Sequence, residues 1–366
     1  ARVAVLGPNA DDPMALFGNY SFQNHVASHF PDHPIERAPT VLAALRERLG
    51  SERVVHEPGC RILRAPGQLD DDGSGIPAAA AAARAADVAV LVVGDKAGHF
   101  RTGTVGEGTD AWDLTLPGVQ PALVEAVLAT GTPTVLVLVN GRPFDLSGVA
   151  GRCAAILEAC FPGQDGAAAI ADALLGHVDP SGRTPVTFAR GAGVMPRHYD
   201  HKALAAGIPP LPAFAPVFPF GHGLTYTTFE YADLAIDPGE AATDGAVTVA
   251  CTVRNTGARA GAEVVQLYLR DPVASVTRPA HELRGFARVP LAAGAAARVL
   301  FRVSAELTAF TGPDRARIVE PGRIEAAIGA SSADLRLRGG FTLGGPVRRV
   351  PEARAFLAEA AVEPLA

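Results

Sequence analysis

The sequence has 366 residues, of which 48% are hydrophobic, and its 38 acidic and 32 basic side chains give a net charge of −6. This length allows two or three domains with a sizeable core. The acidic balance and the lack of a basic block argue against nucleic acid as a partner. No apolar run approaches the roughly 20 residues that span a bilayer. We therefore expect a soluble protein with neither nucleic acid nor membrane as a partner.

The four cysteines indicate no metal site and no dense disulfide framework, because none of them forms a C-x-x-C pair. They are Cys60, Cys153, Cys160 and Cys251. We expect them to be reduced and partly buried, which favours the cytoplasm over secretion. The chain opens with ARVAVLGPNADD, without an initiator methionine or a signal segment. This opening suggests a piece of something longer, or a processed chain.

The first half of the chain alternates predicted strands and helices. Short apolar runs predict strands at residues 3–6, 53–56, 87–93, 133–140 and 154–159. Helical spacing or alanine-rich composition predicts helices at residues 40–49, 78–86, 119–130 and 166–175. Strands that are apolar throughout, separated by helices, are typical of a mostly parallel sheet covered on both faces. Residues 1–190 are therefore predicted to form a layered α/β domain.

The second half of the chain has a different pattern. Residues 191–229 are rich in proline, glycine and aromatic residues, which predicts an ordered linker. Residues 230–344 then contain short alternating runs such as AVTVACTVRN and AEVVQLYLRD, separated by turn signals. This pattern predicts an antiparallel β-sandwich. The tail, residues 345–366, is predicted to be weakly helical.

Glu107 is the strongest candidate for chemistry. It lies between Gly106 and Gly108, in a glycine-rich loop that follows the apolar strand at residues 87–93. In open α/β sheets, ligands bind at the carboxyl ends of the strands. A carboxyl group on such a backbone, if partly desolvated, can act as a general acid. From the residues alone, a plain surface glutamate is the favoured interpretation.

Other polar residues have structural alternatives. Asp95, Asp110 and Asp113 could cap a turn or a helix, and the polar run at residues 197–202 could be a loop surface. The sequence holds no Gly-x-Ser-x-Gly elbow, P-loop or H-E-x-x-H motif. Serine nucleophile chemistry, nucleotide hydrolysis and zinc proteolysis therefore lack support, and we expect neither a metal nor a cofactor.

Several motifs, in order, resemble glycoside hydrolase family 3. They are GEGTD at 106–110, LTLPGVQ at 114–120, VNGRP at 139–143, FPGQDG at 161–166, DPSGRTP at 179–185 and FPFGHGLTY at 218–226. Residues 1–344 resemble the C-terminal portion of the family's β-glucosidases and β-xylosidases. The resemblance implies an α/β sandwich followed by a fibronectin type III-like (immunoglobulin-like) sandwich.

The resemblance also implies roles for particular residues. Glu107 matches the family's general acid/base, while the nucleophilic aspartate belongs to an N-terminal β/α barrel in a Ser-Asp-aromatic context that this chain lacks. Relatives often have arginine after the residue matching Asp110, where this chain has Ala111 and Trp112. Trp112, Phe100 and Arg101 could line the aglycone side of a sugar pocket; Trp112 could equally be a packing residue.

Two function hypotheses follow from these observations. In the first, the chain is the C-terminal part of a retaining, exo-acting β-glycosidase that acts on β-linked oligosaccharides or aryl and alkyl β-glycosides and is complete only with a barrel partner. In the second, it is a non-catalytic carbohydrate-associated or assembly module, with homo-oligomer contacts left open. A third hypothesis, catalysis by this chain with Asp200 or Asp95 as nucleophile, lacks the family's context.

Overall fold

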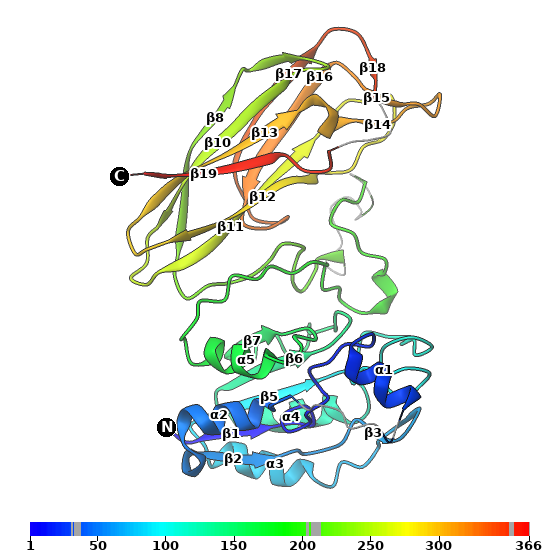
Figure 1. Ribbon diagram of the computed structural model, residues 1–366, viewed down its shortest axis with the longest axis vertical. Coiled ribbons are helices and arrows are strands. Elements are labelled where there is room, and N and C mark those ends of the chain that lie inside the picture. The colour runs from blue at the N-terminus through cyan, green and yellow to red at the C-terminus, as the bar shows by residue number, and fades with distance from the viewer. Residues whose placement is uncertain (31, 33–37, 203–204, 206–213, 351–354, 366) are drawn as a thin grey trace. The chain divides into compact units, whose positions relative to one another are not determined.

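The structure is a computed structural model that describes residues 1–30, 32, 38–202, 205, 214–350 and 355–365 (Figure 1). The chain divides into two units. Unit 1 comprises residues 1–178 and 189–195, and unit 2 comprises residues 179–188 and 196–366. The domain boundaries given above stay a prediction.

Unit 1 is built on a parallel five-stranded sheet in the order β2-β1-β5-β6-β7. Its strands are β1 (Val3–Leu6), β2 (Val54–Glu57), β5 (Val88–Gly94), β6 (Thr134–Val139) and β7 (Ala155–Glu158). The central strands β1, β5 and β6 are nearly continuous buried runs, as a sheet covered on both faces requires. The predicted strands are thus confirmed, with ends that differ by one or two residues.

Helices cover both faces of this sheet (Figure 1). Helices α2 (Val41–Leu49) and α5 (Gly166–Leu174) pack on one face against alternate strand residues such as Val92 and Val137. Helices α3 (Ile76–Arg84) and α4 (Gln120–Leu128) pack together on the other face. Four predicted helices are therefore confirmed.

Sequence reasoning missed the smaller elements of unit 1. They are α1 (Phe22–His29), the one-turn helices η1 (Ser51–Arg53) and η2 (Ala192–Val194), and the hairpin of β3 (Leu63–Ala65) and β4 (Gln68–Leu69). None of the helices in the described part of the chain is long and apolar enough to cross a membrane.

The strand order of unit 1 shows where the winding of the chain reverses. Counting only the parallel strands along the chain, the order is 2-1-3-4-5, so the chain reverses its direction of winding between β1 and β5. The segments that leave β1 and β5 therefore diverge to opposite faces at the carboxyl edge of the sheet, the place where open α/β sheets in general bind ligands. Glu107 lies on the segment after β5, and α1 lies at the same edge on the segment after β1 (Figure 1).

Unit 2 is an antiparallel sandwich of two sheets. One sheet has the order β19-β13-β10-β8, and the other has the order β12-β11-β16-β17-β9, in which only the β9–β17 pair is parallel. Their strands are β8 (Phe229–Asp237), β9 (Glu240–Ala242), β10 (Ala246–Asn255), β11 (Gly261–Arg270), β12 (Glu282–Leu291), β13 (Ala296–Ser304), β16 (Gly322–Gly329), β17 (Leu335–Gly344) and β19 (Glu359–Leu365). The predicted sandwich is confirmed.

Three short strands and a one-turn helix complete unit 2. The strands β14 (Phe310–Thr311), β15 (Arg317–Val319) and β18 (Arg348–Arg349) form a small antiparallel sheet, and the one-turn helix η4 (Ala305–Thr308) follows β13.

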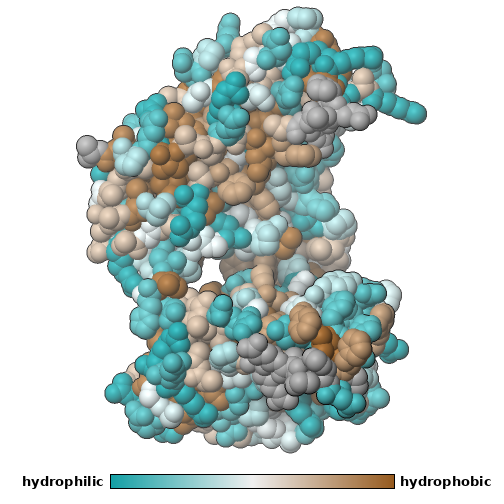
Figure 2. Space-filling model, viewed as in Figure 1, coloured by the Kyte–Doolittle hydropathy of each residue, from teal (hydrophilic) through white to brown (hydrophobic). Residues whose placement is uncertain are grey.

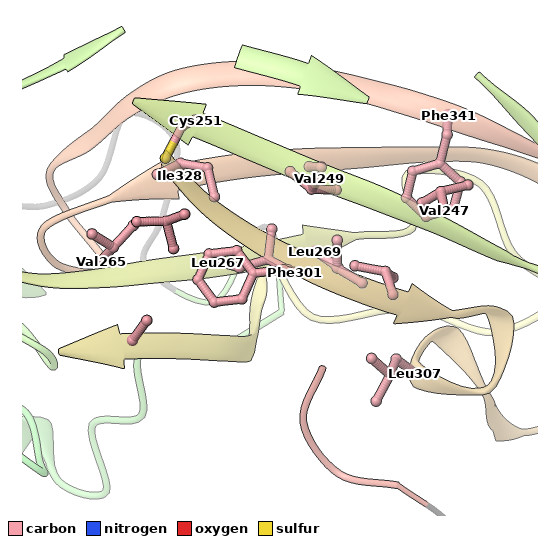
Figure 3. Packing of buried hydrophobic residues seen from close by; sticks show 14 of the residues in the cluster. Val247, Val249, Cys251, Val265, Leu267, Leu269, Phe301, Leu307, Ile328 and Phe341 are labelled. Atoms are coloured by element: carbon pink, nitrogen blue, oxygen red, sulfur yellow. The ribbon is translucent and has the colours of Figure 1, made fainter. Parts of the chain in front are cut away.

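The core of unit 2 lies between its two sheets (Figure 3). Alternate residues of β10 and β13, including Val249 and Phe301, point toward alternate residues of β11 and β16, including Leu267 and Ile328. Phe301 is fully buried. Removing such side chains from water contributes about 1.5–3 kcal/mol each, so these alternating positions hold the sandwich together.

The predicted helical tail is wrong. Residues Glu359–Leu365 form β19, which pairs antiparallel with β13 from Ala296 to Arg302. Pro364 lies within this strand, and proline is tolerated there because β19 is the edge of its sheet. On the face shown in Figure 2, hydrophobic side chains gather over the region of β12, β13 and β19. The exposed hydrophobic residues of these strands include Phe286 and Val362.

Two aromatic residues of the segment rich in proline, glycine and aromatic residues, Tyr199 and Phe220, lie in unit 2 together with β11. The Tyr199 ring stacks on Phe220, with ring centroids 4.1 Å apart, and meets Tyr268 of β11. The carboxylate of Asp179 accepts hydrogen bonds from the backbone N–H groups of Tyr226 and Ala262. These contacts lie within unit 2 and join residues 179–188 and 214–226 to the sandwich.

Candidate active site

The loop that carries Glu107 begins where β5 ends. The β5 residue Gly94 is held by the buried Gln120 side chain, which accepts a hydrogen bond from the Gly94 N–H and donates to its carbonyl, both at 2.9 Å. A Cβ on Gly94 would lie 1.9 Å from the Val139 carbonyl oxygen, so only glycine fits there. The Gln120 side chain thus fixes the point from which the loop leaves the sheet.

The loop folds back on itself through backbone hydrogen bonds. The N–H of Gly98 donates to the carbonyl of Val105, and the N–H of Phe100 donates to the carbonyl of Glu107, at 3.1 and 2.8 Å. The N–H of Thr104 donates to the carbonyl of Lys96 at 2.7 Å. Residues 96–107 therefore form a narrow ribbon, and Glu107 lies on its returning arm.

Glycine is required on each side of Glu107 for a different structural reason. Gly106 has φ +129°, and a Cβ there would lie 2.4 Å from both the Gly98 carbonyl oxygen and the Asn19 side-chain amide. Gly108 has φ +70° but no atom closer than 3.6 Å to its added Cβ. Gly106 is thus required by close approach and backbone conformation, whereas Gly108 is required by conformation alone.

The tip of the ribbon is strained. Phe100 and Arg101 adopt φ values of +47° and +71°, which residues other than glycine rarely take. Arg101 is held there by a hydrogen bond from its N–H to Thr109 Oγ1 at 3.0 Å. Backbone strain of this kind costs of order 1–3 kcal/mol per residue and clusters at functional sites.

The second side of the site comes from the segment after β1. Ser21 caps α1 by accepting a hydrogen bond from the N–H of Asn24 at 3.3 Å. The Asn24 side chain in turn donates to the carbonyls of Phe17 and Gly18, at 3.2 and 2.8 Å. These bonds fix the turn that carries Asn19 and Tyr20.

Asn19 and Tyr20 both contact Glu107. With its side-chain oxygen turned to the loop, Asn19 accepts a hydrogen bond from the Glu107 N–H at 3.1 Å and donates to the Gly98 carbonyl at 2.9 Å. The Tyr20 hydroxyl donates to Glu107 Oε2 at 2.9 Å. The backbone and one carboxylate oxygen of Glu107 are therefore held by the segment after β1.

A cluster of aromatic and imidazole rings supports this contact. His99 is 2% exposed, and its Nδ1 lies 4.0 Å from Glu107 Oε2, while its Nε2 donates to the carbonyl of Asn19 at 2.8 Å. The Tyr20 ring meets His99 edge-on, with centroids 5.5 Å apart, and the ring of His25 packs on both. The hydrogen bond to Glu107 is the main cause that raises the pKa of Tyr20, so this hydroxyl stays a donor.

Asp95 is buried and stabilises the base of the loop from inside the protein. Its side chain is fully buried, with Oδ1 accepting a hydrogen bond from Thr104 Oγ1 at 2.8 Å and Oδ2 lying 3.4 Å from Arg142 Nε. Burial raises the pKa of Asp95, while Arg142 and Thr104 oppose this shift. A carboxyl group with no exposed surface cannot attack a sugar, so the hypothesis of Asp95 as nucleophile is not supported.

The three predicted sugar-contacting residues lie on the loop or just after it, and all are exposed. The exposed fraction is 96% for Trp112 and 63% for Phe100, and Arg101 is also exposed. The alternative packing role of Trp112 is therefore not realised among the described residues. Hydrophobic side chains lie at the surface beside α1 in Figure 2. Exposed aromatic side chains of this kind are available to a ligand or another domain.

Two of the remaining polar candidates, Asp113 and Lys202, have structural contacts. Asp113 accepts hydrogen bonds from the N–H and hydroxyl of Thr115, so it stabilises a turn. In unit 2, Lys202 donates to the carbonyl of Thr277. Within the described ranges, no group of three or more His, Cys, Asp or Glu side chains has the geometry to hold a metal ion. Sequence reasoning missed Asn19, Tyr20 and His99; the N-cap signal of Ser21 could have pointed to α1, but no local signal pairs Tyr20 with Glu107.

The comparisons with known proteins agree with the motifs quoted above. Residues 1–226 match the glycosyl hydrolase family 3 C-terminal domain, and residues 263–332 match a fibronectin type III-like domain. The chain belongs to glycosyl hydrolase family 3. It is 35% identical to a periplasmic β-glucosidase of Salmonella typhimurium and 36% identical to a β-xylosidase of Formosa agariphila, over 93% and 90% of this chain.

Solved structures of the family have the same fold. The structure of a β-glucosidase involved in saponin metabolism from intestinal bacteria covers 94% of this chain, with a TM-score of 0.84 and 34% identity. A β-glucosidase of Listeria innocua in complex with glucose covers 94% of this chain, with a TM-score of 0.80 and 28% identity. The chain spans about half the length of these relatives: 46% and 44% of the two curated enzymes, and 50% and 46% of the two solved chains.

Proposed function

We propose that this chain is the C-terminal part of a retaining, exo-acting β-glycosidase and that Glu107 is its general acid/base. The observation that carries the proposal is that the Glu107 side chain is both exposed and held by a hydrogen bond. It is 46% exposed at the carboxyl edge of the sheet, while one of its oxygens is held by Tyr20. A carboxyl group that is both fixed and accessible can reach a substrate. The family membership of the chain supports the same role.

In the proposed reaction, Glu107 acts twice. An aspartate of an N-terminal barrel attacks the anomeric carbon, and the carboxyl proton of Glu107 passes to the glycosidic oxygen as the bond to it breaks. Glu107, now a carboxylate, then removes a proton from water, which attacks the glycosyl-enzyme and releases the sugar. Retention requires the two carboxyl groups to stand about 5–5.5 Å apart, so the barrel must present its aspartate next to the exposed side of Glu107.

The substrate is a terminal, non-reducing β-linked sugar, as in a β-glucoside or β-xyloside. Trp112, Phe100 and Arg101 are proposed to contact the aglycone, because all three are exposed beside Glu107 in the chain and aromatic rings cover the apolar faces of sugars. Among relatives, both a β-glucosidase and a β-xylosidase are similar to this chain to nearly the same degree. The chain therefore favours neither sugar.

The test compares the 366-residue chain, the same chain extended upstream to its natural start, and the extended chain carrying Glu107→Gln. We expect the extended chain to hydrolyse aryl and alkyl β-glucosides or β-xylosides. Glu107→Gln should lower kcat/KM for alkyl glycosides about 10²–10⁴-fold, because general acid catalysis typically contributes that much. Hydrolysis by the extended chain that Glu107→Gln leaves unchanged would overturn the assignment.

A second variant identifies the role of the residue rather than its importance. In Glu107→Ala, azide can enter the space of the lost carboxylate and attack the glycosyl-enzyme without a base. We expect added azide to speed turnover of an activated aryl glycoside and to yield a β-glycosyl azide, detected by NMR. Sugar binding without turnover, in the extended chain or with a barrel added as a second chain, would instead favour the non-catalytic module.

A further inference from the structure

The two oxygens of the Glu107 carboxyl group have different surroundings. Oε2 accepts the hydrogen bond of the Tyr20 hydroxyl and lies 4.0 Å from His99 Nδ1. Oε1 has no hydrogen-bond partner among the residues that the structure describes. The carboxyl group therefore has an inner oxygen that faces the segment after β1 and an outer oxygen that faces away from these contacts.

We propose that Tyr20 is a positioning residue that leaves the proton transfers of Glu107 to Oε1. This inference rests on the proposed function of Glu107 and names the oxygen that acts. A hydroxyl that donates to Oε2 makes that oxygen the poorer site for a proton, since one of its two lone pairs is already engaged, whereas both lone pairs of Oε1 are available. The acidic proton then lies on Oε1, toward the leaving oxygen, and the same Oε1 takes the proton from water in the second step. Tyr20 itself transfers no proton.

The structure supports Tyr20 as a rigid donor. Its ring packs edge-on against His99, which is 2% exposed and is held by its own hydrogen bond to the Asn19 carbonyl. The turn that carries Tyr20 is fixed by Asn24 and by the Ser21 cap of α1. Hydrogen bonds to an ionised carboxylate are shorter and about twice as strong as neutral ones. The donor is therefore both oriented and favoured in the base form of Glu107.

The geometry also explains why the loop and the turn are tied together twice. Asn19 accepts from the Glu107 backbone N–H, and Tyr20 donates to the Glu107 side chain. One bond fixes the position of the residue and the other fixes the rotation of its carboxyl group. Misplacement of a catalytic group by about 1 Å can cost 10²-fold in rate, so both bonds matter for the reaction.

The decisive variant is Tyr20→Phe in the extended, active chain. Tyr20 is 68% exposed, so loss of its hydroxyl leaves the packing of unit 1 unchanged. We expect kcat/KM for alkyl β-glycosides to fall about 10–100-fold, which is less than the roughly 10²–10⁴-fold of general acid catalysis because the carboxyl group is kept. For 2,4-dinitrophenyl glycosides, whose leaving group needs little protonation, we expect a change below about threefold. KM should change little for either substrate.

Two controls separate positioning from a structural effect. Phe22→Leu alters an equally exposed aromatic residue two positions further on, at the start of α1, and it should leave the ratio of the two kcat/KM values unchanged. Tyr20→Phe added to Glu107→Ala should have no further effect, because the carboxylate it acts on is gone.

An equal loss on both substrates, no loss, or an additive loss in the double variant would overturn the inference. The inference and the proposed function fail differently. If Glu107→Gln leaves hydrolysis intact, the assignment of Glu107 itself is wrong. If Glu107→Gln abolishes hydrolysis of alkyl glycosides but Tyr20→Phe does not alter it, only the role of Tyr20 is wrong.

Discussion

The two units of this chain are both built on apolar sheets, but they differ at the carboxyl edge of unit 1. In unit 2, alternate strand residues such as Val249 and Leu267 fill one continuous core. In unit 1, the sheet is equally apolar, but its carboxyl edge gathers a buried carboxyl group in Asp95, backbone strain at Phe100 and an exposed glutamate. Buried charge and strain destabilise a fold, and unit 2 has them as well, in the buried ion pair of Glu263 with Arg183 and in the positive φ of Asp233. The carboxyl edge of unit 1 differs in that these features lie next to an exposed carboxyl group, that of Glu107.

Two buried polar atoms at the carboxyl edge lack a hydrogen-bond partner. Asp95 Oδ2 and Arg142 Nε are buried and make no hydrogen bond, although they lie 3.4 Å apart as an ion pair. Glu158, at the end of β7, is also affected: burial raises its pKa, while hydrogen bonds from Asn140 and Cys160 oppose the shift. The comparison therefore predicts that substitutions in unit 2 act on stability, whereas substitutions at this edge act on activity.

The largest effect is expected in the core of unit 2. Phe301→Ala removes a fully buried ring and should lower the free energy of unfolding by about 3–5 kcal/mol. Urea denaturation followed by circular dichroism measures this loss. Phe286→Ala, at a position 51% exposed in the same sandwich, should cost less than about 0.5 kcal/mol. Equal costs for the two variants would contradict the packing described here.

The glycines beside Glu107 provide a matched pair with a smaller effect on stability. Gly106→Ala places a Cβ against the Gly98 carbonyl oxygen, which must shift. Because displacement of a catalytic group by about 1 Å can cost 10²-fold, we expect kcat/KM of the extended chain to fall by about that factor. Gly108→Ala meets no close atom and should cost about 1–2 kcal/mol of local strain with a much smaller loss of activity. The proposed reason for Gly106 fails if the two variants lose activity equally.

The smallest effect is expected for the reactivity of the thiol of Cys160, an exposed residue just after β7. Desolvation and the neighbouring Glu158 raise the pKa of this thiol from 9.0 to about 11. At pH 8 the thiolate is then about 100-fold scarcer, but a more basic thiolate is a better nucleophile, so alkylation should be roughly tenfold slower than for an ordinary thiol.

Iodoacetamide labelling followed by peptide mass spectrometry checks this rate. Glu158→Gln removes the negative charge and should speed labelling of Cys160. If Cys160 reacts at the ordinary rate and Glu158→Gln does not change that rate, burial and Glu158 do not raise the pKa of the Cys160 thiol as described.

Much of the fold could be predicted from local patterns. Continuous apolar runs such as the one that forms β5 indicate buried parallel strands, and the ends of the elements were correct to within one or two residues. The tail was misassigned because its alanines favour a helix locally. The pairing of β19 with β13 joins residues about 60 positions apart and overrides that preference. The short polar helix α1 lacks an apolar stripe and was missed for the same local reason.

The candidate site could be predicted only in part. Glu107 was found through its glycines and the family motif, and its position after β5 follows from the strand pattern. Tyr20 and Asn19 could not be found, because they are 87 and 88 positions away and meet the loop only once β1 and β5 lie side by side. A hydrogen bond that depends on sheet topology has no signature in the sequence of either segment alone.

The edge strand β19 has a practical consequence for anyone who shortens this protein. A form that ends at Gly344 would look complete by the usual limits of a sandwich domain, yet it would uncover the backbone N–H and carbonyl groups of β13 from Ala296 to Arg302. Unpaired strand edges recruit other chains. Such a form should therefore self-associate, and an affinity tag is better attached after Leu365 than in place of the last strand.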